Sequence, residues 1–198
     1  MSTTLPGAPG WRTRPRSGFR RCRISTPQGL VIAGLPAAQC AVAVGDRAGA
    51  GVLLVELLGW AQRIGNEEYV ARLPALVRCA LAAGDAGSAA RLVEGVEGPL
   101  PLYEHALLAA RAQLAEVGGE YADAAEQFRQ AAERWQRFGA VLEQAYALLG
   151  QGRCLTTLGD PVADMPLRWA RALFDEMGAR PRVGECDTLI AQTSKVSS

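Results

Sequence analysis

Apolar residues recur at intervals of three and four through most of the chain, and this spacing predicts amphipathic α-helices with one buried stripe each. The pattern is clearest over residues 102–117 and 121–138. In the second range the stripe consists of Ala124, Ala125, Phe128, Ala131, Ala132 and Trp135. We find no convincing alternation of apolar and polar residues, which is the pattern typical of strands, so the sequence predicts an all-α fold.

A glycine followed by an acidic residue separates these helices at intervals of 39, 35 and 40 residues. The pairs are Gly45-Asp46, Gly84-Asp85, Gly119-Glu120 and Gly159-Asp160. Glycine ends a helix because it adopts a left-handed backbone without steric penalty, and the acid can cap the next helix or favour its positive end. The repeat therefore predicts a right-handed α-α superhelix of about three to four helical hairpins.

The remaining helices follow from the same pattern. They are expected over residues 51–64, 69–83, 86–95, 143–158 and 166–177, with a capping helix over 181–193. Pro74 should interrupt the second of these helices and Pro166 should begin the fifth, because proline is tolerated only in the first turn. We expect the regular array over residues 66–198, preceded at residues 36–65 by a weak or degenerate first helical pair.

Positive charge is concentrated at the start of the chain. Residues 1–45 contain six arginines and no acidic residue, whereas the remainder contains fifteen basic and twenty acidic residues. The six are Arg12, Arg14, Arg16, Arg20, Arg21 and Arg23. The abundance of Pro, Gly and Ser predicts that residues 1–35 form a disordered arm, which either contacts acidic partners or is an unstructured lead-in. The acidic remainder has no broad basic face, so no nucleic-acid partner is expected.

The location of the protein is predicted from the apolar stretch and the cysteines. Residues 29–44 are similar to a secretory signal with a candidate cleavage site at residues 41–43, but Gly34 and Pro36 interrupt the apolar core. No apolar run approaches the roughly 18 residues of a membrane span. The five cysteines are widely spaced (Cys22, Cys40, Cys79, Cys154 and Cys186), which indicates free thiols in a reducing compartment. The sequence therefore favours a cytoplasmic protein without a membrane segment.

Residues for catalysis or cofactor binding are scarce. The single lysine, Lys195, lies in the polar C-terminal tail, so no phosphate-binding loop of the Gly-Lys-Ser/Thr type is present in the chain. His105 is the sole histidine, and we expect it at the surface or in a cap rather than in a metal site or a proton relay. We therefore predict no catalytic, cofactor-binding or metal-binding residues, and no enzymatic activity.

Small and aromatic residues in the array match a known repeat. In the best unit these are Ala112, Ala115, Gly119, Tyr121, Ala124, Phe128 and Ala131. The next unit keeps Leu148, Gly152, Leu155 and Gly159, and the preceding one keeps Gly84, Ala89 and Val93. With these residues, the chain from about residue 66 to 193 resembles the tetratricopeptide (TPR) repeat. The resemblance implies a protein–protein interaction module, and we expect a regulatory or scaffold part of a bacterial signalling system.

A second resemblance concerns the sequences over residues 146–155 and 171–181. They are similar to the C-terminal helical-repeat region of bacterial nucleotide-cyclase-linked ATPases and LuxR-type ATP-dependent regulators. The alternative is therefore that the chain is a C-terminal fragment of such a protein, whose catalytic domain is absent from this sequence. Neither a cyclase motif nor a helix-turn-helix is recognisable in the chain, so neither activity is carried over.

A candidate binding surface follows from the repeat geometry, because the first helices of successive hairpins line the concave side of such a stack. Arg78, Gln113 and Arg153 occupy equivalent positions on three first helices. The predicted concave peptide-binding face comprises Arg78, Gln113, Glu116, Tyr146, Leu149, Arg153 and Thr156. It could hold a protein or peptide partner through charge-assisted hydrogen bonds. The alternative is that these are ordinary exposed or inter-repeat positions. The apolar ends of a short stack also suggest a homo-oligomer.

Overall fold

The computed structural model describes residues 27–64 and 67–196, and every regular element within these ranges is helical. The α-helices are α1 (Pro27–Ala43), α2 (Arg47–Ile64), α3 (Glu67–Ala83), α4 (Ala86–Val93), α5 (Pro101–Gly118), α6 (Tyr121–Phe138), α7 (Val141–Thr157), α8 (Asp164–Glu176) and α9 (Arg180–Val196). A short 3₁₀ turn, η1 (Pro161–Ala163), precedes α8. The all-α fold predicted from the sequence is confirmed.

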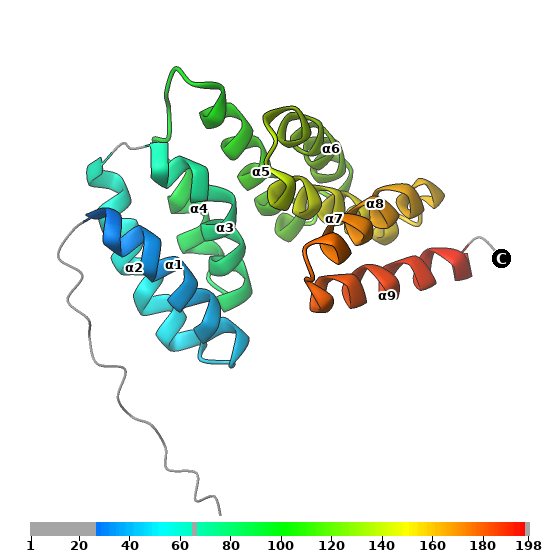
Figure 1. Cartoon of the computed structure of the whole chain (residues 1–198), viewed down its shortest axis with the longest axis horizontal. Helices are drawn as coiled ribbons and strands as arrows, with labels where there is room; N and C mark the ends of the chain where they lie inside the picture. Colours follow the sequence, from blue (N-terminus) through cyan, green and yellow to red (C-terminus); the bar gives the residue numbers. More distant parts are fainter. Residues whose placement is uncertain (1–26, 65–66, 197–198) are drawn as a thin grey trace, which may run out of the picture.

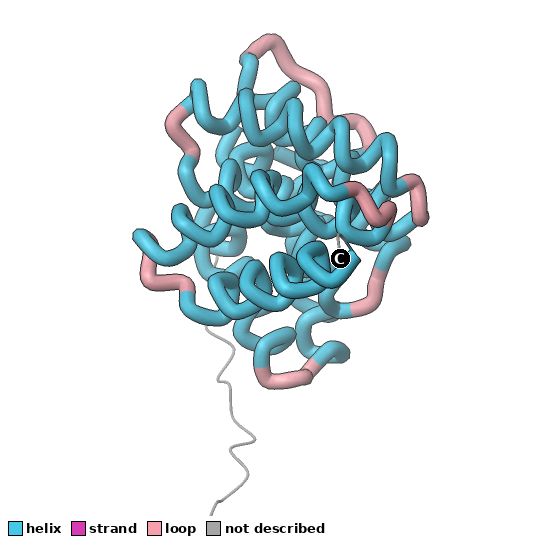
Figure 2. Tube along the Cα trace, turned by 90° about the vertical axis from the view of Figure 1, so that its right-hand side faces the viewer, coloured by secondary structure: helices cyan, strands magenta, loops and turns pink. Residues whose placement is uncertain are grey.

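Consecutive helices pack as hairpins that stack from α1 to α9 along a curved path (Figure 1). The first helices of the hairpins, α3, α5 and α7, follow one another along the stack. The second helices, α4, α6 and α8, pack against them. Seen from the side, the connecting loops lie at the edges of the stack (Figure 2). The arrangement is the expected right-handed α-α superhelix. No helix in the described part of the chain is both long enough and apolar enough to cross a bilayer.

The helix ends follow the glycine and acid pattern in part. Gly119 ends α5 with φ +84°, and its N–H donates to carbonyls of the last turn, as a left-handed cap requires. The acids behave differently from one another. Asp85 accepts a hydrogen bond from the backbone N–H of Ser88 at 2.8 Å, and Asp160 accepts one from Val162 at 2.9 Å. Glu120 makes no such side-chain bond, so the acid of this pair does not cap α6.

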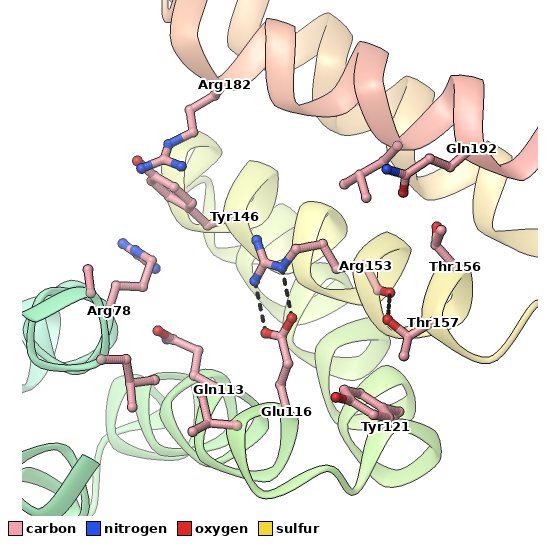
Figure 3. Close-up of a pocket in the computed structure, with 14 residues that line it drawn as sticks. Arg78, Gln113, Glu116, Tyr121, Tyr146, Arg153, Thr156, Thr157, Arg182 and Gln192 are labelled. Carbon is pink, nitrogen blue, oxygen red and sulfur yellow. Dashed lines mark hydrogen bonds and ion pairs between the residues drawn. The ribbon is translucent and has the colours of Figure 1, made fainter. Parts of the chain in front are cut away.

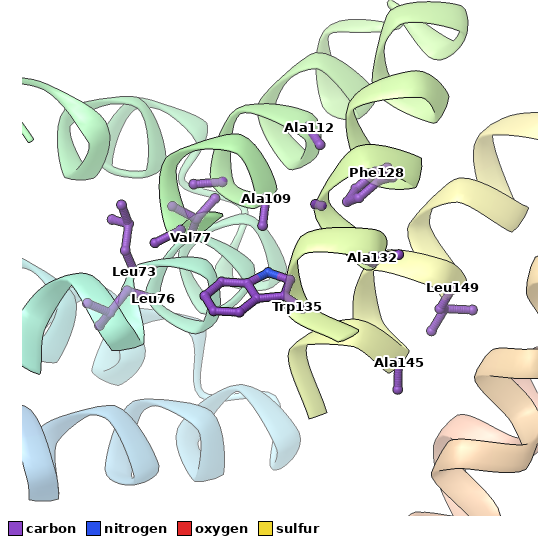
Figure 4. Close-up of a cluster of buried hydrophobic side chains, with 14 of the residues drawn as sticks. Leu73, Leu76, Val77, Ala109, Ala112, Phe128, Ala132, Trp135, Ala145 and Leu149 are labelled. Atoms are coloured by element: carbon purple, nitrogen blue, oxygen red, sulfur yellow. The ribbon is translucent and has the colours of Figure 1, made fainter. Parts of the chain in front are cut away.

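The core combines small residues on facing helices with leucines and large aromatic side chains. Phe128 and Trp135, both on α6, are each 2% exposed and lie in a cluster with buried alanines from α5 and α7 (Figure 4). A Cβ atom added at Gly150 of α7 would lie 2.5 Å from Cζ of Phe128. The glycine therefore allows α6 and α7 to approach closely, and Phe128 fills the space between two hairpins, as expected.

The N-terminal expectation needs correction. The part of the predicted arm that covers residues 1–26 lies outside the described residues, but residues 27–35 belong to α1 and are helical. Leu35 is 4% exposed and packs in the same core as Leu57 of α2. A Cβ at Gly34 would lie 3.0 Å from Leu57. Burial of apolar surface thus sustains this helix despite the proline at position 36.

Pro74 and Pro166, which the sequence placed at helix interruptions or starts, both lie within helices. Pro74 does not interrupt α3, which continues from Glu67 to Ala83 around it. Pro74 is buried in the core together with both flanking turns, so tertiary packing outweighs the helix-breaking tendency of proline. The helix expected to start at Pro166 starts two residues earlier, at Asp164, and Pro166 occupies its first turn, where a backbone N–H has no intrahelical acceptor.

Candidate functional site

A cavity of about 590 Å³ opens on the side of the stack formed by α3, α5, α7 and α9 (Figure 3). We call it the concave cavity. Six of the seven residues selected from the sequence line it: Arg78, Gln113, Glu116, Tyr146, Arg153 and Thr156. The cavity therefore brings together side chains from three successive hairpins. The capping helix α9 forms a further wall.

Leu149 does not belong to this surface. Its side chain is fully buried and packs in the hydrophobic core of α7, in the cluster that contains Ala145 (Figure 4). Burial of a leucine side chain stabilises the fold by about 1.5–3 kcal/mol, and this gain determines its position. The prediction that Leu149 lines the cavity was wrong.

Arg78 connects two hairpins that are not adjacent in the stack. Its guanidinium donates to both carboxylate oxygens of Glu143 on α7, at 2.9 and 2.8 Å. The same guanidinium lies 3.8 Å from the centre of the Tyr146 ring. The side chains of Arg78 and Glu143 are only 23% and 13% exposed, so water screens the pair weakly. The two parallel hydrogen bonds to Glu143 and the contact with the Tyr146 ring together fix the orientation of the Arg78 guanidinium.

Arg153 is held by acidic residues of two other helices. It donates to Glu116 on α5 through two bonds of 2.7 and 2.8 Å, and to Glu185 on α9 at 3.2 Å. Arg182 also donates to Glu185, at 2.6 Å. Burial disfavours the charged guanidinium of Arg153, but its bonds to Glu116 and the charges of Glu116 and Glu185 outweigh this and hold its pKa above the ordinary value. The arginines expected to offer free charge to a ligand are thus already paired within the protein.

Gln113 differs from the arginines at the equivalent positions. Its side chain is 5% exposed, and its Nε2 donates to the backbone carbonyls of Pro74 at 3.1 Å and Ala109 at 3.2 Å. Two acceptors on one side fix the orientation of the amide, because the reverse orientation would set its oxygen against both carbonyls. The Oε1 atom is buried and has no hydrogen-bond partner. Leaving such an acceptor unpaired costs about 1–3 kcal/mol.

Thr156 lines the cavity but has its hydroxyl occupied. It donates to the carbonyl of Gly152 at 2.8 Å, and Thr157 donates to the carbonyl of Arg153 at 2.9 Å. Both hydroxyls are thereby turned toward their own helix. Neither threonine therefore has its hydroxyl hydrogen free to donate to a ligand.

Besides Thr157, Arg182 and Gln192, two sets of residues at the cavity or next to its arginines were not predicted from the sequence. The first is an apolar rim comprising Leu81, Ala82, Val117, Tyr121 and Leu189. Of these, Val117 has 58% of its surface exposed. The sequence pattern could have indicated these positions, because Val117 and Leu81 both lie in the last turn before a helix-ending glycine. The second set is the acids Glu143 and Glu185, whose pairing across 65 and 32 residues has no local signal in the sequence.

The residues considered for chemistry lie elsewhere. His105 is on α5, with its ring 5.6 Å from those of Trp135 and Phe138 and its Nδ1 against the carbonyl of Pro101. Burial raises the pKa of Cys154 to about 12 and that of Cys186 to about 11, so both thiols are protonated at neutral pH. Over the described residues, no three His, Cys, Asp or Glu side chains are placed to share a metal ion.

Comparison with known proteins bears on the fold. Neither protein-family models nor curated proteins yield a match to this sequence. A solved structure does match, that of TPR-like repeats of a putative kinesin light chain from Podosopora anserina, with a TM-score of 0.51 and 14% identity. The match covers 88% of this chain and 97% of the other. The chain has a TPR-like helical-repeat fold. At this identity the likeness concerns architecture alone.

Proposed function

We propose that this protein is a non-catalytic, TPR-like interaction module that holds an extended segment of a protein partner in the concave cavity. The observation that carries the proposal is the convergence of six side chains, selected from the repeat pattern, on one cavity between α3, α5, α7 and α9. Its volume of about 590 Å³ lies in the range of ligand sites, roughly 300–1,000 Å³. Curved helical-repeat proteins generally use their concave side for extended partners.

The test is selection of binders from a displayed library of random seven-residue peptides, with the full chain immobilised. Ala82 lies exposed on the cavity wall, and Ala82→Trp would fill the cavity without disturbing the core. Ala90 is an exposed alanine on α4 outside the cavity, and Ala90→Trp is the matched control. Peptides retained by the wild type and by Ala90→Trp, but not by Ala82→Trp, would support the proposal. Equal retention by all three proteins would refute it.

The biological setting we propose is regulation or scaffolding in a bacterial cytoplasmic signalling system. The support is the similarity of residues 146–155 and 171–181 to repeat regions of cyclase-linked ATPases and LuxR-type regulators. The alternative is that the chain is a C-terminal fragment of such a regulator. Detection of the endogenous protein with an antibody against residues 66–193 separates the two. A band near 21.0 kDa supports an independent module, and a much larger band supports the fragment.

Self-association is a second candidate function, favoured by exposed apolar side chains at the N-terminal end of the array. Val44 is 80% exposed, Val52 60% and Val55 55%. An end of a helical stack usually presents a polar surface to water, so these valines suit contact with a second copy. Light scattering over a range of concentrations tests this. A dimer that Val52→Glu dissociates would support self-association, and a monomer at the highest concentration would refute it.

A further inference from the structure

The charged groups at the concave cavity neutralise one another in pairs. Three arginines meet three glutamates: Arg78 with Glu143, Arg153 with Glu116, and Arg182 with Glu185. Each pair has an N–O distance between 2.6 and 2.8 Å. A ligand carboxylate could bind one of these guanidiniums only by displacing the glutamate that is already paired with it. The displaced and partly buried charge would then lack a partner, which is costly.

The most prominent aromatic side chain of the cavity is also occupied. The guanidinium of Arg78 lies over Tyr146, that of Arg182 lies 5.6 Å from the ring centre, and Phe174 packs edge-on at 5.2 Å. Two guanidiniums and one aromatic ring therefore already contact Tyr146, and a cationic ligand would compete with Arg78 for it. Neither a carboxylate nor a cation finds an unpaired counterpart among these groups.

What the cavity also offers is apolar surface, the exposed amide of Gln192 and the unpaired acceptor of Gln113. The apolar rim defined above lies at the ends of α3 and α5, at the start of α6 and on α9, and Val117 is the most exposed of its valine and leucine side chains. Gln113 lies on the cavity wall between Arg78 and Glu116, with its Oε1 unpaired and its Nε2 held by two carbonyls. This oxygen is buried, so a ligand donor can reach it only if a neighbouring side chain shifts.

From this arrangement we infer that the concave cavity selects an uncharged, extended peptide segment with aliphatic side chains. The aliphatic side chains pack on the apolar rim, and one backbone N–H of the segment donates to Oε1 of Gln113. The inference rests on the proposed function and specifies its ligand. It replaces the expectation that arginines at the concave side grip carboxylates, because each of those arginines already holds a glutamate.

The experiment uses the peptides retained by the wild-type chain but not by Ala82→Trp. Their affinities are measured by fluorescence anisotropy at 50 and 500 mM NaCl. We expect sequences without charged residues at their central positions and an affinity that changes less than about twofold, since screening acts only on charged ligands. Peptides rich in Asp, Glu, Lys or Arg whose affinity falls more than tenfold would overturn the inference and leave the proposed function standing. Failure to retain any peptide would overturn both.

Two further variants locate the contacts. Val117→Lys and Val117→Glu should each weaken binding at least tenfold, because either charge is placed against an uncharged ligand. Val162, 56% exposed in η1, gives the matched controls Val162→Lys and Val162→Glu, which should bind as the wild type does. Opposite effects of Lys and Glu at position 117 would show a charged ligand and overturn the inference.

The role of Gln113 is tested by methylating each backbone nitrogen of a retained peptide in turn. One methylation should weaken binding to the wild type about tenfold yet leave binding to Gln113→Met nearly unchanged, because the variant lacks the acceptor. Circular dichroism shows whether Gln113→Met is folded, and Gln113→Leu, which also lacks the acceptor, provides a second variant. Equal sensitivity of every protein to every methylation would overturn the assignment of Gln113.

Discussion

Arg153 on α7 and Glu116 on α5 form a two-bond ion pair, with nitrogen–oxygen distances of 2.7 and 2.8 Å, in the wall of the concave cavity. The two residues belong to adjacent hairpins, so the pair fixes the position of one hairpin against the next. Arg153 also donates a hydrogen bond to Glu185, so a third helix, α9, is linked to the same arginine. Because Glu116 is only 17% exposed, removal of the arginine would leave a poorly solvated negative charge without its partner, whereas Glu185 would keep Arg182.

Arg153→Ala should therefore lower the free energy of unfolding by about 1–3 kcal/mol, between the costs of breaking an exposed and a buried pair. Arg129 on α6 is the control, since its ion pairs with Glu126 and Glu133 lie on an exposed helix surface. Arg129→Ala should cost clearly less, because water screens exposed ion pairs. Urea denaturation followed by circular dichroism measures both. Equal losses for the two variants would contradict the role assigned to Arg153.

Gly150→Ala should destabilise the protein by about 1–3 kcal/mol, because its added Cβ would lie 2.5 Å from the Phe128 ring. Gly184 on α9 provides an opposite control, since a Cβ there meets no atom within 4 Å. Gly184→Ala should stabilise the protein by roughly 0.5–1 kcal/mol through helix propensity. Thermal melting of both variants checks the signs. A stable Gly150→Ala protein would show that α6 and α7 are less tightly packed than described.

Asp85→Ala should cost about 1 kcal/mol, the usual effect of losing a helix cap, whereas Glu120→Ala should be nearly neutral. Hydrogen bonds from the side chain and backbone of Ser88 hold the pKa of Asp85 below its ordinary value. The stabilising effect of Asp85 is therefore present above the pKa of the unfolded carboxyl and is lost as the pH falls through the lower folded pKa. Urea denaturation at pH 7 and pH 3 should show the difference between wild type and Asp85→Ala shrinking at the lower pH.

The stability of the protein should fall above about pH 9, where an unfolded cysteine ionises. Burial keeps Cys154 protonated in the folded protein, with a pKa of about 12, so the unfolded chain binds fewer protons in this range. The free energy of unfolding then decreases with rising pH by at most about 1.4 kcal/mol per pH unit for this thiol. Unfolding by urea at pH 8 and pH 10.5 should show a smaller decrease for Cys154→Ala than for the wild type. The same decrease in both would argue against a neutral buried thiol.

Local rules account for most of the fold. The three- and four-residue spacing of apolar positions and the recurrent glycines predicted the helices from α3 onward, because each helix is defined by residues close together in sequence. The beginning of α1 was missed, since Pro36 and Gly34 argue against a helix locally. Only the burial of Leu35 and Ala38 against α2, a tertiary effect, reveals why a helix forms there.

The position of the candidate site could be predicted from the sequence, but the pairing of its charged side chains could not. Equivalent positions in successive hairpins must lie side by side, so Arg78, Gln113 and Arg153 converge as expected. Whether an arginine is free or paired depends on contacts between distant helices. The bond from Arg78 to Glu143 spans 65 residues, and no local sequence pattern near either residue predicts it. The assignment of Leu149 failed because helix periodicity alone does not distinguish a cavity wall from the core just beneath it.

The bond between Arg78 and Glu143 has a consequence for how the array unfolds. A helical stack in which each hairpin touches only its neighbours can lose a terminal hairpin while the rest stays intact. Here the first helix of one hairpin is tied to the first helix of the hairpin two places along, at 2.8 and 2.9 Å. Detachment of the C-terminal hairpin must break this bond, and so fraying at that end is resisted by a residue two hairpins away. Unfolding of the array is therefore more cooperative than that of a simple linear stack. The same bonds fix the curvature of the stack around the cavity.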